Sequence, residues 1–511
     1  MRRPVVGRPC GRGFLEPYSM LDSVDLKAEM SKEAFREARE AVSRRLGEIQ
    51  RQARDAQLPV LLVFDGWQAS GLGTVIGKIL AALDPRGYKL YTFDVPVDEA
   101  LLRPPMWRYW MTLPPRGGIG VYDGGWYGDV LRAKKKDRAD VCRRIGVFER
   151  QQADDGAVIV KIWLHISKKE QAKRFRKIEK DEARAWRITR QDWRHHEQYE
   201  SRCRIVDEML EETSTDYAPW TVIPAENLRY ATIEAAKTII GALEGALGKS
   251  GELAARAGRA GARPHRDADT KRGSRSPLED VDLTLTVDPE DYQRQLEKLQ
   301  DKLLEAEHLL YLPRVPVVIV YEGWDASGKG GNIKRLVASL DHRGFEVIPV
   351  GPPVGDEKTH HYLWRFWKSL PKGGHITIFD RSWYGRVLVE RVEGLATASE
   401  WSRAYNEINE FENELTDYGM VLVKFWMHIS KEEQLRRFEL RQQTPWKTWK
   451  ITEEDWRNRE KWDAYYGAVS DMLVKTSTAN APWTIIEGNN KLHARIKALR
   501  TVLGAINARL K

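Results

Sequence analysis

Short apolar runs alternate with stretches of helical periodicity along most of the chain. In the second half, the apolar runs predict strands over 315–321, 345–350, 375–380, 420–428 and 483–487. Between these runs, the spacing of apolar positions predicts helices over 289–309, 330–340, 357–369, 397–418 and 430–442. Because parallel strands need long helical connections, this alternation predicts an α/β fold with a mostly parallel sheet flanked by helices. Anionic ligands are then expected at the carboxyl ends of the strands.

The same pattern occurs twice in the chain. Gly66 and Gly323 begin similar motifs 257 residues apart, whereas Trp193 and Trp456 lie 263 residues apart in matching segments. An offset that shifts once, by six residues, indicates two homologous units with one small insertion between them. A period near 260 residues is too long for a solenoid repeat and indicates a duplicated domain.

The 511 residues divide into four predicted segments. These are an unstructured N-terminal tail over 1–20, a first domain over 21–248, a flexible linker over 249–280 and a second domain over 281–511. The linker is rich in Gly, Ala and Arg and has few large apolar residues, which is typical of flexible segments. Each domain has the ordinary size of an α/β unit and is long enough to bury a core.

A glycine-rich loop follows the strand predicted at 315–321. Residues 323–331 read Gly-Trp-Asp-Ala-Ser-Gly-Lys-Gly-Gly. Glycines allow a tight turn whose N–H groups point at a phosphate, and a lysine at this position reaches the phosphoryl group. We therefore predict phosphate binding by Gly323, Gly328, Gly330 and Lys329. Because Gly330 stands where such loops usually have Ser or Thr, Asp325 is the candidate to supply an oxygen ligand to Mg²⁺.

A second acidic motif, Asp380-Arg381-Ser382, ends the strand predicted at 375–380. An aspartate at the end of a neighbouring strand can reach the same metal ion. Arg381 offers a planar fork for phosphate oxygens. The alternative is that this tripeptide only caps the following helix.

The first domain retains the loop but has lost its charged groups. It keeps the glycines and the strand-end Asp123, but has Gln68, Leu72 and Gly124 where the second domain has the loop aspartate, the loop lysine and the arginine. Without the lysine and the arginine, two charges that stabilise a transferring phosphoryl group are missing. We predict that the first domain is catalytically silent. Its Asp123 and the basic run 134–136 leave open a role in holding a phosphate-containing polyanion or a purely architectural role, and the domain can pack as half of an internal pseudo-dimer.

Basic and aromatic residues are interleaved over 430–466. This composition predicts a helical basic lid over the phosphate site, with Arg436 and Arg437 as the arginines most suited to act there. The alternative is an amphipathic helix pair whose tryptophans face the core and whose cations face water.

Composition indicates which kind of partner and which cellular compartment to expect. The chain has 83 Lys and Arg against 74 Asp and Glu, a net charge of +9, which favours an anionic partner, although the linker and tail hold part of this excess. Cys10, Cys142 and Cys203 show no metal or redox spacing, and the sequence has no long apolar span or signal-peptide core. We predict a cytoplasmic protein with no membrane partner.

The motifs at 322–331, 380–394 and 424–430 resemble those of the polyphosphate kinase 2 family. Tandem domains with a degenerate first copy are similar to the two-domain class of that family. The resemblance implies two tandem P-loop kinase-like domains, with chemistry in the second. It further implies transfer of the terminal phosphoryl group of inorganic polyphosphate to AMP, giving ADP, with Mg²⁺ as cofactor and Mn²⁺ as an alternative.

The resemblance also implies roles by position. Asp325 and Asp380 hold Mg²⁺, and Lys329 neutralises donor phosphate. Arg381 and Arg391 grip the acceptor phosphate and the transferred group. The residues implied to bind phosphate or substrate are Gly323, Gly328, Gly330, Arg386, Arg391, Lys424, Arg436 and Arg437. The implied catalytic residues are Asp325, Lys329, Asp380 and Arg381.

Other functions remain open at this point. Related kinases act on other nucleoside mono- or diphosphates, and an ATP-dependent kinase could use the same loop. A non-enzymatic protein could bind polyphosphate or nucleic acid through charge and stacking. The two predicted metal-holding carboxylates argue against simple anion binding, so nucleic acid is not an expected partner. A homo-oligomer is an alternative to the internal pseudo-dimer.

Overall fold

The computed structural model describes residues 19–93, 98–259, 275–444, 451 and 453–511. The chain forms two compact units, and each is an α/β domain. Unit 1 comprises Met1–Asp94 with Pro114–Arg259, and unit 2 comprises Val95–Leu113 with Ala260–Lys511. The predicted fold class is therefore confirmed.

Unit 2 contains a five-stranded parallel sheet with the order β10-β9-β6-β8-β7. Its strands are β6 (Val317–Gly323), β7 (Phe345–Pro349), β8 (Ile376–Asp380), β9 (Val421–His428) and β10 (Trp483–Glu487). The central strand β6 pairs with β8 on one side and with β9 on the other. The loop after β6 and the residues that end β8 therefore emerge at the same edge of the sheet.

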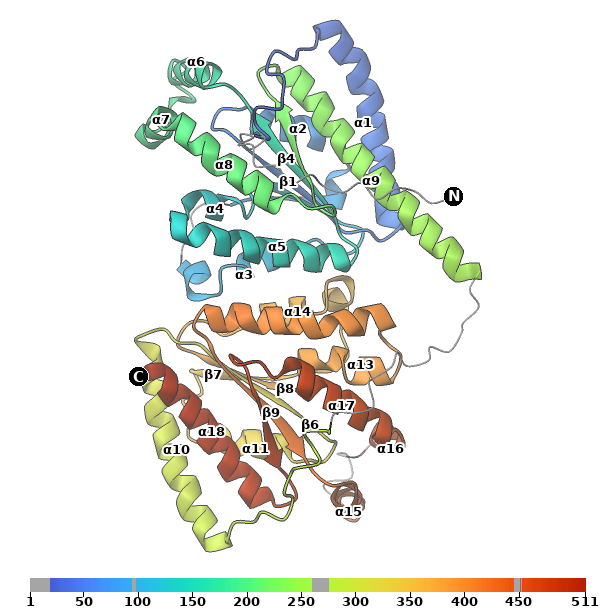
Figure 1. The fold of residues 1–511 in the computed structure, drawn as a ribbon, viewed down its shortest axis with the longest axis vertical. Helices are drawn as coiled ribbons and strands as arrows, with labels where there is room; N and C mark the ends of the chain where they lie inside the picture. The colour runs from blue at the N-terminus through green and yellow to red at the C-terminus, as the bar shows by residue number, and fades with distance from the viewer. Residues whose placement is uncertain (1–18, 94–97, 260–274, 445–450, 452) are drawn as a thin grey trace, which may run out of the picture. The chain divides into compact units, whose positions relative to one another are not determined.

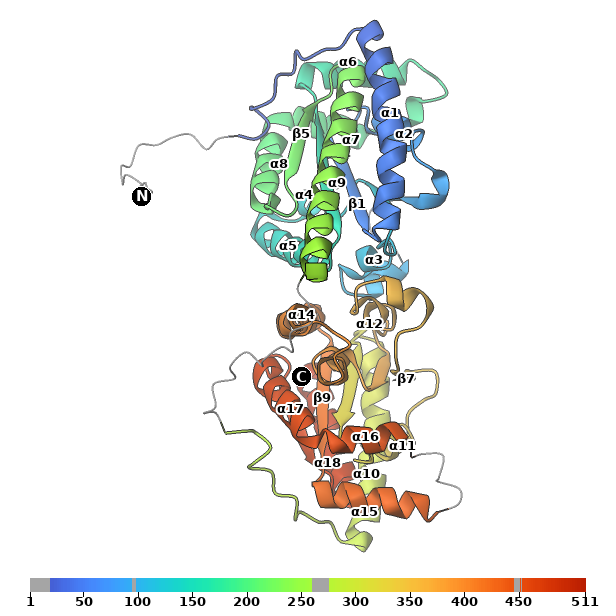
Figure 2. The ribbon, with the colours of Figure 1, turned by 90° about the vertical axis from the view of Figure 1, so that its right-hand side faces the viewer.

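Helices cover both faces of this sheet (Figures 1 and 2). Helices α10 and α18 pack together on one face, and α18 also contacts α11 and β9, whereas α14 contacts β9 and α17 on the other. The helices are α10 (Pro289–Tyr311), α11 (Lys329–Leu336), η5 (Gly355–Thr359), α12 (Trp364–Lys368), η6 (Trp383–Arg386), α13 (Val389–Val392), α14 (Ala398–Asp417), α15 (Lys431–Gln442), α16 (Glu453–Glu460), α17 (Trp462–Thr476) and α18 (Lys491–Leu510).

One predicted helix of unit 2 differs from the structure. The segment 357–369 forms the short η5 and α12 in place of one helix. His360 between them has an extended backbone, with φ −117° and ψ 167°, which ends the first helical turn. The other predicted strands and helices agree with the observed elements to within a few residues at each end.

Unit 1 repeats the architecture with the strand order β2-β3-β1-β4-β5, again all parallel. Its strands are β1 (Val60–Gly66), β2 (Tyr88–Thr92), β3 (Ile119–Asp123), β4 (Val158–His165) and β5 (Trp220–Pro224). Its helices are α1 (Lys32–Asp55), α2 (Leu72–Leu80), η1 (Pro85–Gly87), α4 (Gly128–Arg132), η3 (Lys135–Asp137), α5 (Arg138–Asp154), α6 (Lys168–Glu179), η4 (Ala185–Arg187), α7 (Arg190–Glu197), α8 (Tyr199–Thr213) and α9 (Leu228–Arg259). The short η2 (Asp98–Leu102) and α3 (Trp107–Trp110) belong to the segment assigned to unit 2.

The ends of the predicted domains fall partly outside the described residues. Helix α9 continues to Arg259, so the first part of the segment 249–280 is helical. Residues 260–274 and the tail up to residue 18 lie outside the described residues. Among the helices that the structure describes, none has a stretch long and apolar enough to cross a membrane.

Candidate active site

The glycine loop of unit 2 joins the end of β6 to the start of α11. Gly323 has φ +148°, and a Cβ there would lie 2.6 Å from the carbonyl oxygen of Met427 on β9, so only glycine fits. Gly328 precedes α11 with φ +108°, a left-handed conformation that glycine adopts without strain. The sequence therefore folds into a loop that ends at the N-terminus of a helix, a usual arrangement for phosphate binding. Gly330 lies in the first turn of α11, and a side chain there would meet open space.

Lys329 is the first residue of α11, and its side chain reaches back to the loop. Its Nζ donates hydrogen bonds to the carbonyl oxygens of Gly323 at 2.7 Å and Trp324 at 3.2 Å. Burial lowers the pKa of Lys329, and the negative charge of Asp325 opposes that shift. The ammonium group is thus held where it would neutralise the negative charge of a phosphate bound by the loop.

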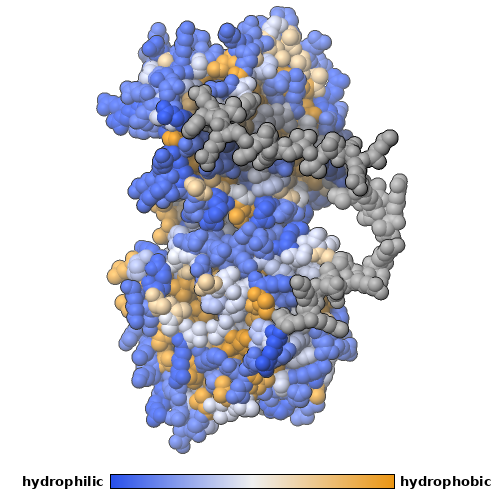
Figure 3. Space-filling view, in the orientation of Figure 1, coloured by the Kyte–Doolittle hydropathy of each residue, from blue (hydrophilic) through white to orange (hydrophobic). Residues whose placement is uncertain are grey.

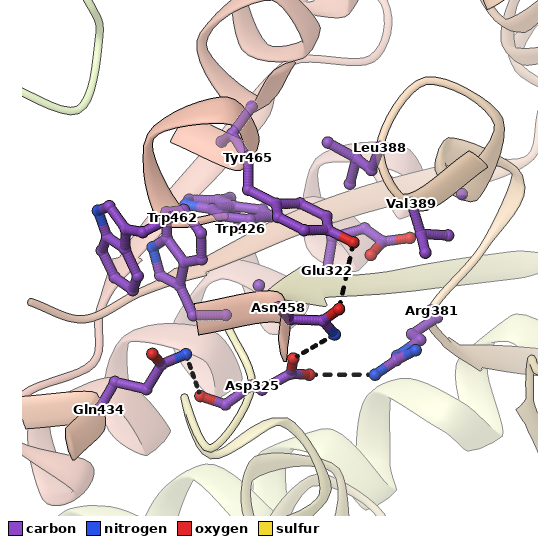
Figure 4. A pocket seen from close by; sticks show the side chains of 14 residues that line it. Glu322, Asp325, Arg381, Leu388, Val389, Trp426, Gln434, Asn458, Trp462 and Tyr465 are labelled. Carbon is purple, nitrogen blue, oxygen red and sulfur yellow. Dashed lines mark hydrogen bonds and ion pairs between the residues drawn. The ribbon is translucent and has the colours of Figure 1, made fainter. Parts of the chain in front are cut away.

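Asp325 and Arg381 meet at the mouth of the loop (Figure 4). The Asp325 carboxylate forms an ion pair with Arg381 at 3.1 Å and accepts a hydrogen bond from Asn458 Nδ2 at 3.1 Å. Asn458 comes from α16, so this contact ties the segment after α15 to the phosphate loop. Burial acts to lower the pKa of Arg381, but the carboxylates of Asp325, Glu322 and Asp380 raise it overall. The charges predicted from two separate motifs therefore form one cluster.

Arg381 has an unusual backbone conformation. Its φ is +67°, in the left-handed region that side chains with a Cβ rarely adopt, and the matching Gly124 of unit 1 has φ +70°. The left-handed region costs a non-glycine residue roughly 1–2 kcal/mol. The turn is therefore common to both units, and unit 2 accommodates an arginine at a position suited to glycine.

Two further carboxylates border the cluster. Asp380 ends β8, and within the described residues its carboxylate makes no hydrogen bond or ion pair. Glu322 is buried at the end of β6 and accepts a hydrogen bond from the Ser382 hydroxyl at 2.8 Å. Burial raises the pKa of Glu322. The metal-holding role of Asp380 stays a prediction, and Glu322 had no predicted role.

An aromatic cavity adjoins Asp325 on one side (Figure 4). Trp462 stacks on Trp324 with ring centroids 3.8 Å apart and an interplanar angle of 12°. Tyr465, together with Leu388 and Val389, adds to the wall. The cavity thus has a flat apolar surface beside a charged loop, which suits a ligand with a ring and a phosphate.

A cationic cavity adjoins the loop at Gly328. Its lining includes three arginines and a lysine from α11, α15 and α18 besides Arg437, namely Arg335, Arg441, Lys491 and Arg495. Burial lowers the pKa of Lys491 to about 8, and the neighbouring Arg437 contributes to the shift. So many cations around one cavity suit a polyanion.

The sequence alone did not predict this cationic cavity. Lys491 and Arg495 lie four residues apart at the start of α18, far along the chain from the loop. A signal was present in the duplication, because the matching residues of unit 1 are the uncharged Leu228 and Thr232.

Arg437 lines the cationic cavity, but its guanidinium is engaged by backbone carbonyl groups, and its predicted phosphate-binding role stays a prediction. Its guanidinium donates to the carbonyl oxygens of Ala326 and Ser327, both at 2.9 Å, and to those of Gly488 at 2.6 Å and Asn489 at 3.1 Å. Its side chain is only 3% exposed. Arg437 therefore clamps the phosphate loop to the segment before α18.

Unit 1 contains the same clamp. Arg174 donates to the carbonyl oxygens of Ala69 and Ser70 and to those of Ala225 and Glu226. Because the clamp is present around a loop without its lysine, it serves the fold of the loop.

The prediction that Lys424 contacts polyphosphate is wrong. Lys424 is 0% exposed, and its Nζ donates to Glu412 at 2.7 Å, to the Tyr384 hydroxyl at 2.9 Å and to the Thr476 carbonyl at 2.7 Å. Lys161 of unit 1 makes the matching contacts. A buried lysine needs such partners, and this one has no donor left for a ligand.

The remaining predicted arginines are engaged in ion pairs. Arg386 pairs with Glu390 at 3.2 Å, Arg391 with Asp471 at 2.8 Å, and the exposed Arg436 with Glu433 at 2.7 Å. None of the three lines the aromatic or the cationic cavity. Their phosphate-binding roles stay predictions.

The loop of unit 1 keeps its backbone but not its chemistry. Leu72 begins α2 at the position of the loop lysine, and Leu228 packs against Gly71. Apolar side chains thus occupy two positions that are cationic in unit 2.

Comparisons with known proteins also divide the chain into two related parts. The model of the polyphosphate kinase 2 family matches residues 29–250 and again 286–511. The polyphosphate:AMP phosphotransferase of Pseudomonas aeruginosa is 40% identical over 506 residues, which cover 96% of this chain and 99% of that protein. The polyphosphate:AMP phosphotransferase of Acinetobacter johnsonii is 36% identical over 475 residues, covering 90% and 93%. The crystal structure of a putative polyphosphate kinase 2 from P. aeruginosa superposes with a TM-score of 0.85 at 36% identity, covering 96% of this chain and 99% of that one.

Proposed function

The chain belongs to the polyphosphate kinase 2 family, and from this premise we propose that it transfers the terminal phosphoryl group of inorganic polyphosphate to AMP, giving ADP. The observation that carries the proposal is the charge cluster of unit 2, in which Asp325, Lys329 and Arg381 meet between an aromatic and a cationic cavity. Two cavities that meet at one phosphate loop suit a reaction with two phosphorylated substrates.

The aromatic cavity is our candidate for the acceptor. The rings of Trp462 and Tyr465 offer a surface on which the purine of AMP can stack. Arg381 lines the same cavity and can orient the AMP phosphate through its planar fork. Asp325 lies beside it, where it orients the attacking phosphate oxygen.

The cationic cavity is our candidate for the donor. Lys491 and Arg495 line it, and it reaches the phosphate loop at Gly328. The backbone N–H groups at the start of α11 and the ammonium of Lys329 then face the phosphoryl group that is transferred. A polyphosphate chain is neutralised along its length by such a row of cations.

The donor set also fits a hard divalent cation. Asp380 offers a carboxylate without a partner among the described residues, and Asp325 offers a second at the loop. Mg²⁺ prefers one or two carboxylates together with water and phosphate oxygens, and Mn²⁺ accepts the same ligands. When bound by these carboxylates, the ion would offset the negative charge that develops on the phosphate groups.

The reaction needs positioning and charge neutralisation from the protein. A phosphate oxygen of AMP forms a bond to the terminal phosphorus of the chain, and the bond from that phosphorus to the bridging oxygen breaks. The bridging oxygen keeps the electron pair, so the chain leaves one phosphate shorter. Lys329 and Arg381 stabilise the charge on the transferring group.

We further propose that unit 1 is silent, that the protein is cytoplasmic, and that Cys142 and Cys203 stay reduced there. Both cysteines are free in the structure, and burial raises the pKa of each to about 12, which suppresses the thiolate. A homo-oligomer and an internal pseudo-dimer remain the two predicted assemblies.

The experiment measures ADP formation from AMP and polyphosphate with Mg²⁺, beside parallel reactions with ATP as donor and with GMP as acceptor. Lys329→Ala should lower kcat by about 100-fold or more, because it removes a charge aimed at the transferring group. Leu72→Ala is the matched control and should leave the rate unchanged. Turnover with ATP alone would contradict the donor assignment, and equal rates for the two variants would contradict the assignment of chemistry to unit 2.

A further inference from the structure

One segment of unit 1 has a larger excess of positively charged residues than the matching segment of unit 2. The segment 168–197, here called the unit 1 hairpin, contains α6, η4 and α7. It has eleven Lys and Arg against six Asp and Glu, whereas the matching segment 431–460 of unit 2 has eight against seven. The unit that lost its catalytic charges therefore has the more cationic hairpin.

The inner face of the unit 1 hairpin is firmly anchored. Phe175 packs edge-on against Trp193 with ring centroids 5.1 Å apart, and His196 hydrogen-bonds Gln171 at 2.7 Å. Trp193 Nε1 also donates to Glu179 at 2.8 Å. These contacts join α6 to α7 without any ligand. The solvent-exposed side of the hairpin, here called its outer face, therefore needs no ligand in order to form.

The outer face carries cations without partners. Six exposed residues form no ion pair within the described part of the chain: Lys169, Arg176, Lys177, Lys180, Arg187 and Arg190. Figure 3 shows the region of α6 and α7, at the upper left, as a mostly hydrophilic surface. Trp186, which is 77% exposed, lies in η4.

We propose that the outer face of the unit 1 hairpin is a second binding surface for long-chain polyphosphate, distinct from the cavities of unit 2. The inference rests on the proposed function, which makes this polyanion the donor substrate. Like charges gathered on one surface repel each other, and a flexible chain with one charge per phosphate relieves that repulsion. Release of the counterions condensed on the chain adds to the affinity at low salt.

The surface would act by raising the local concentration of polyphosphate chain ends around the protein. A long chain held at unit 1 keeps its free ends near the same molecule, so the second binding event becomes intramolecular. A chain of three phosphates is too short to occupy two sites at once. The expected signature is therefore a dependence on chain length.

The test replaces three hairpin cations together, as Arg176→Ala, Lys177→Ala and Lys180→Ala, in the full chain. The matched control removes the same charge from exposed positions of α1, as Lys32→Ala, Arg36→Ala and Arg39→Ala. Steady-state rates are measured with tripolyphosphate and with chains of several hundred phosphates. We expect the KM for the long chains to rise about fivefold or more in the hairpin variant only. The kcat and the KM for tripolyphosphate should stay unchanged in both variants.

Direct binding separates this inference from the proposed function. End-labelled long-chain polyphosphate is titrated onto the Lys329→Ala protein, with and without the hairpin substitutions, at two salt concentrations. Weaker binding and a shallower salt dependence in the hairpin variant would support the surface even if the wild type made no ADP. Unchanged binding and unchanged KM would overturn the inference while leaving ADP formation intact.

A competition arm tests the other polyanion that such a surface could take. An exposed tryptophan among cations can also stack on bases, as in proteins that bind single-stranded nucleic acid. If oligonucleotide of equal charge displaces polyphosphate at lower concentration, and Trp186→Ala abolishes that advantage, the surface is a nucleic-acid site and the inference is wrong. Stronger competition by unlabelled polyphosphate would support it.

Discussion

Replacing Lys424 by methionine tests whether the buried lysine serves the fold. Lys424 and Glu412 are both 0% exposed, and the pair is held at 2.7 Å. Glu412 also accepts hydrogen bonds from Trp383 Nε1 at 3.0 Å and from the Tyr384 hydroxyl at 2.6 Å. Lys424→Met keeps the length of the side chain but leaves Glu412 without a counter-charge in the core. Breaking a buried pair in this way costs about 3–5 kcal/mol.

The assay is calorimetric or urea unfolding of the full chain, read as the transition of unit 2. For a unit of this size a loss of 3–5 kcal/mol corresponds to a fall in Tm of roughly 10 °C. Lys161→Met is the matched control, since Lys161 pairs with Glu149 at 2.9 Å in the core of unit 1. It should lower the transition of unit 1 by a similar amount. Two units that unfold separately give two transitions, so each variant reports on its own unit.

The pH dependence of the Lys424→Met variant gives a second readout. Burial raises the pKa of Glu412, and the charge of Lys424 is the main opposing influence. Without the lysine this folded-state pKa rises further above its unfolded value. A group with a raised pKa destabilises the folded state above that pKa, so the deficit should shrink as pH falls from 8 towards 5.

A measurement of the KM for polyphosphate can refute this reasoning. If Lys424 serves only the fold, the variant assayed well below its Tm should keep the KM of the wild type for polyphosphate. A loss of stability below 1 kcal/mol together with a tenfold rise in that KM would show that Lys424 binds polyphosphate.

Three further outcomes follow from the active site. Arg381→Gly should be more stable than Arg381→Ala by about 1 kcal/mol in urea unfolding, because only glycine adopts φ +67° without strain; equal stabilities would contradict the left-handed backbone. The kcat/KM for polyphosphate should fall as pH rises through about 8, where Lys491 loses its charge, and Lys491→Arg should abolish this fall. Trp462→Ala should raise the KM for AMP about tenfold without changing the KM for polyphosphate, because it removes the ring stacked on Trp324.

The sequence predicted the charge cluster because the topology of parallel sheets determines where strand ends lie. Asp325, Lys329 and Arg381 follow two predicted strands, and the carboxyl ends of neighbouring parallel strands meet at one edge. Local patterns were therefore sufficient for these residues. The left-handed backbone of Arg381 could not be predicted from its own identity, although Gly124 at the matching position was consistent with it.

Residues whose role depends on tertiary packing were not predicted correctly. Lys424 lies in an apolar strand near the phosphate loop, and its sequence position did not reveal Glu412 as its partner. The partner comes from α14, and only the packing of that helix on β9 brings the two charges together. Likewise, α18 follows the loop by more than 150 residues, so the cationic cavity forms only when α18 packs against α11.

The duplication separates scaffold from chemistry within one chain. The charged positions that have the same residue type and the same contacts in both units are explained by the fold itself. They include Lys161 with Lys424, and Arg174 with Arg437. The positions that are cationic only in unit 2, although the surrounding backbone is the same, include Lys329 against Leu72, Arg381 against Gly124, and Lys491 against Leu228. A cation that the fold does not require and that lies at the phosphate loop is explained by a phosphate ligand. By this comparison we assign Lys491 to the proposed donor site and Lys424 to the core.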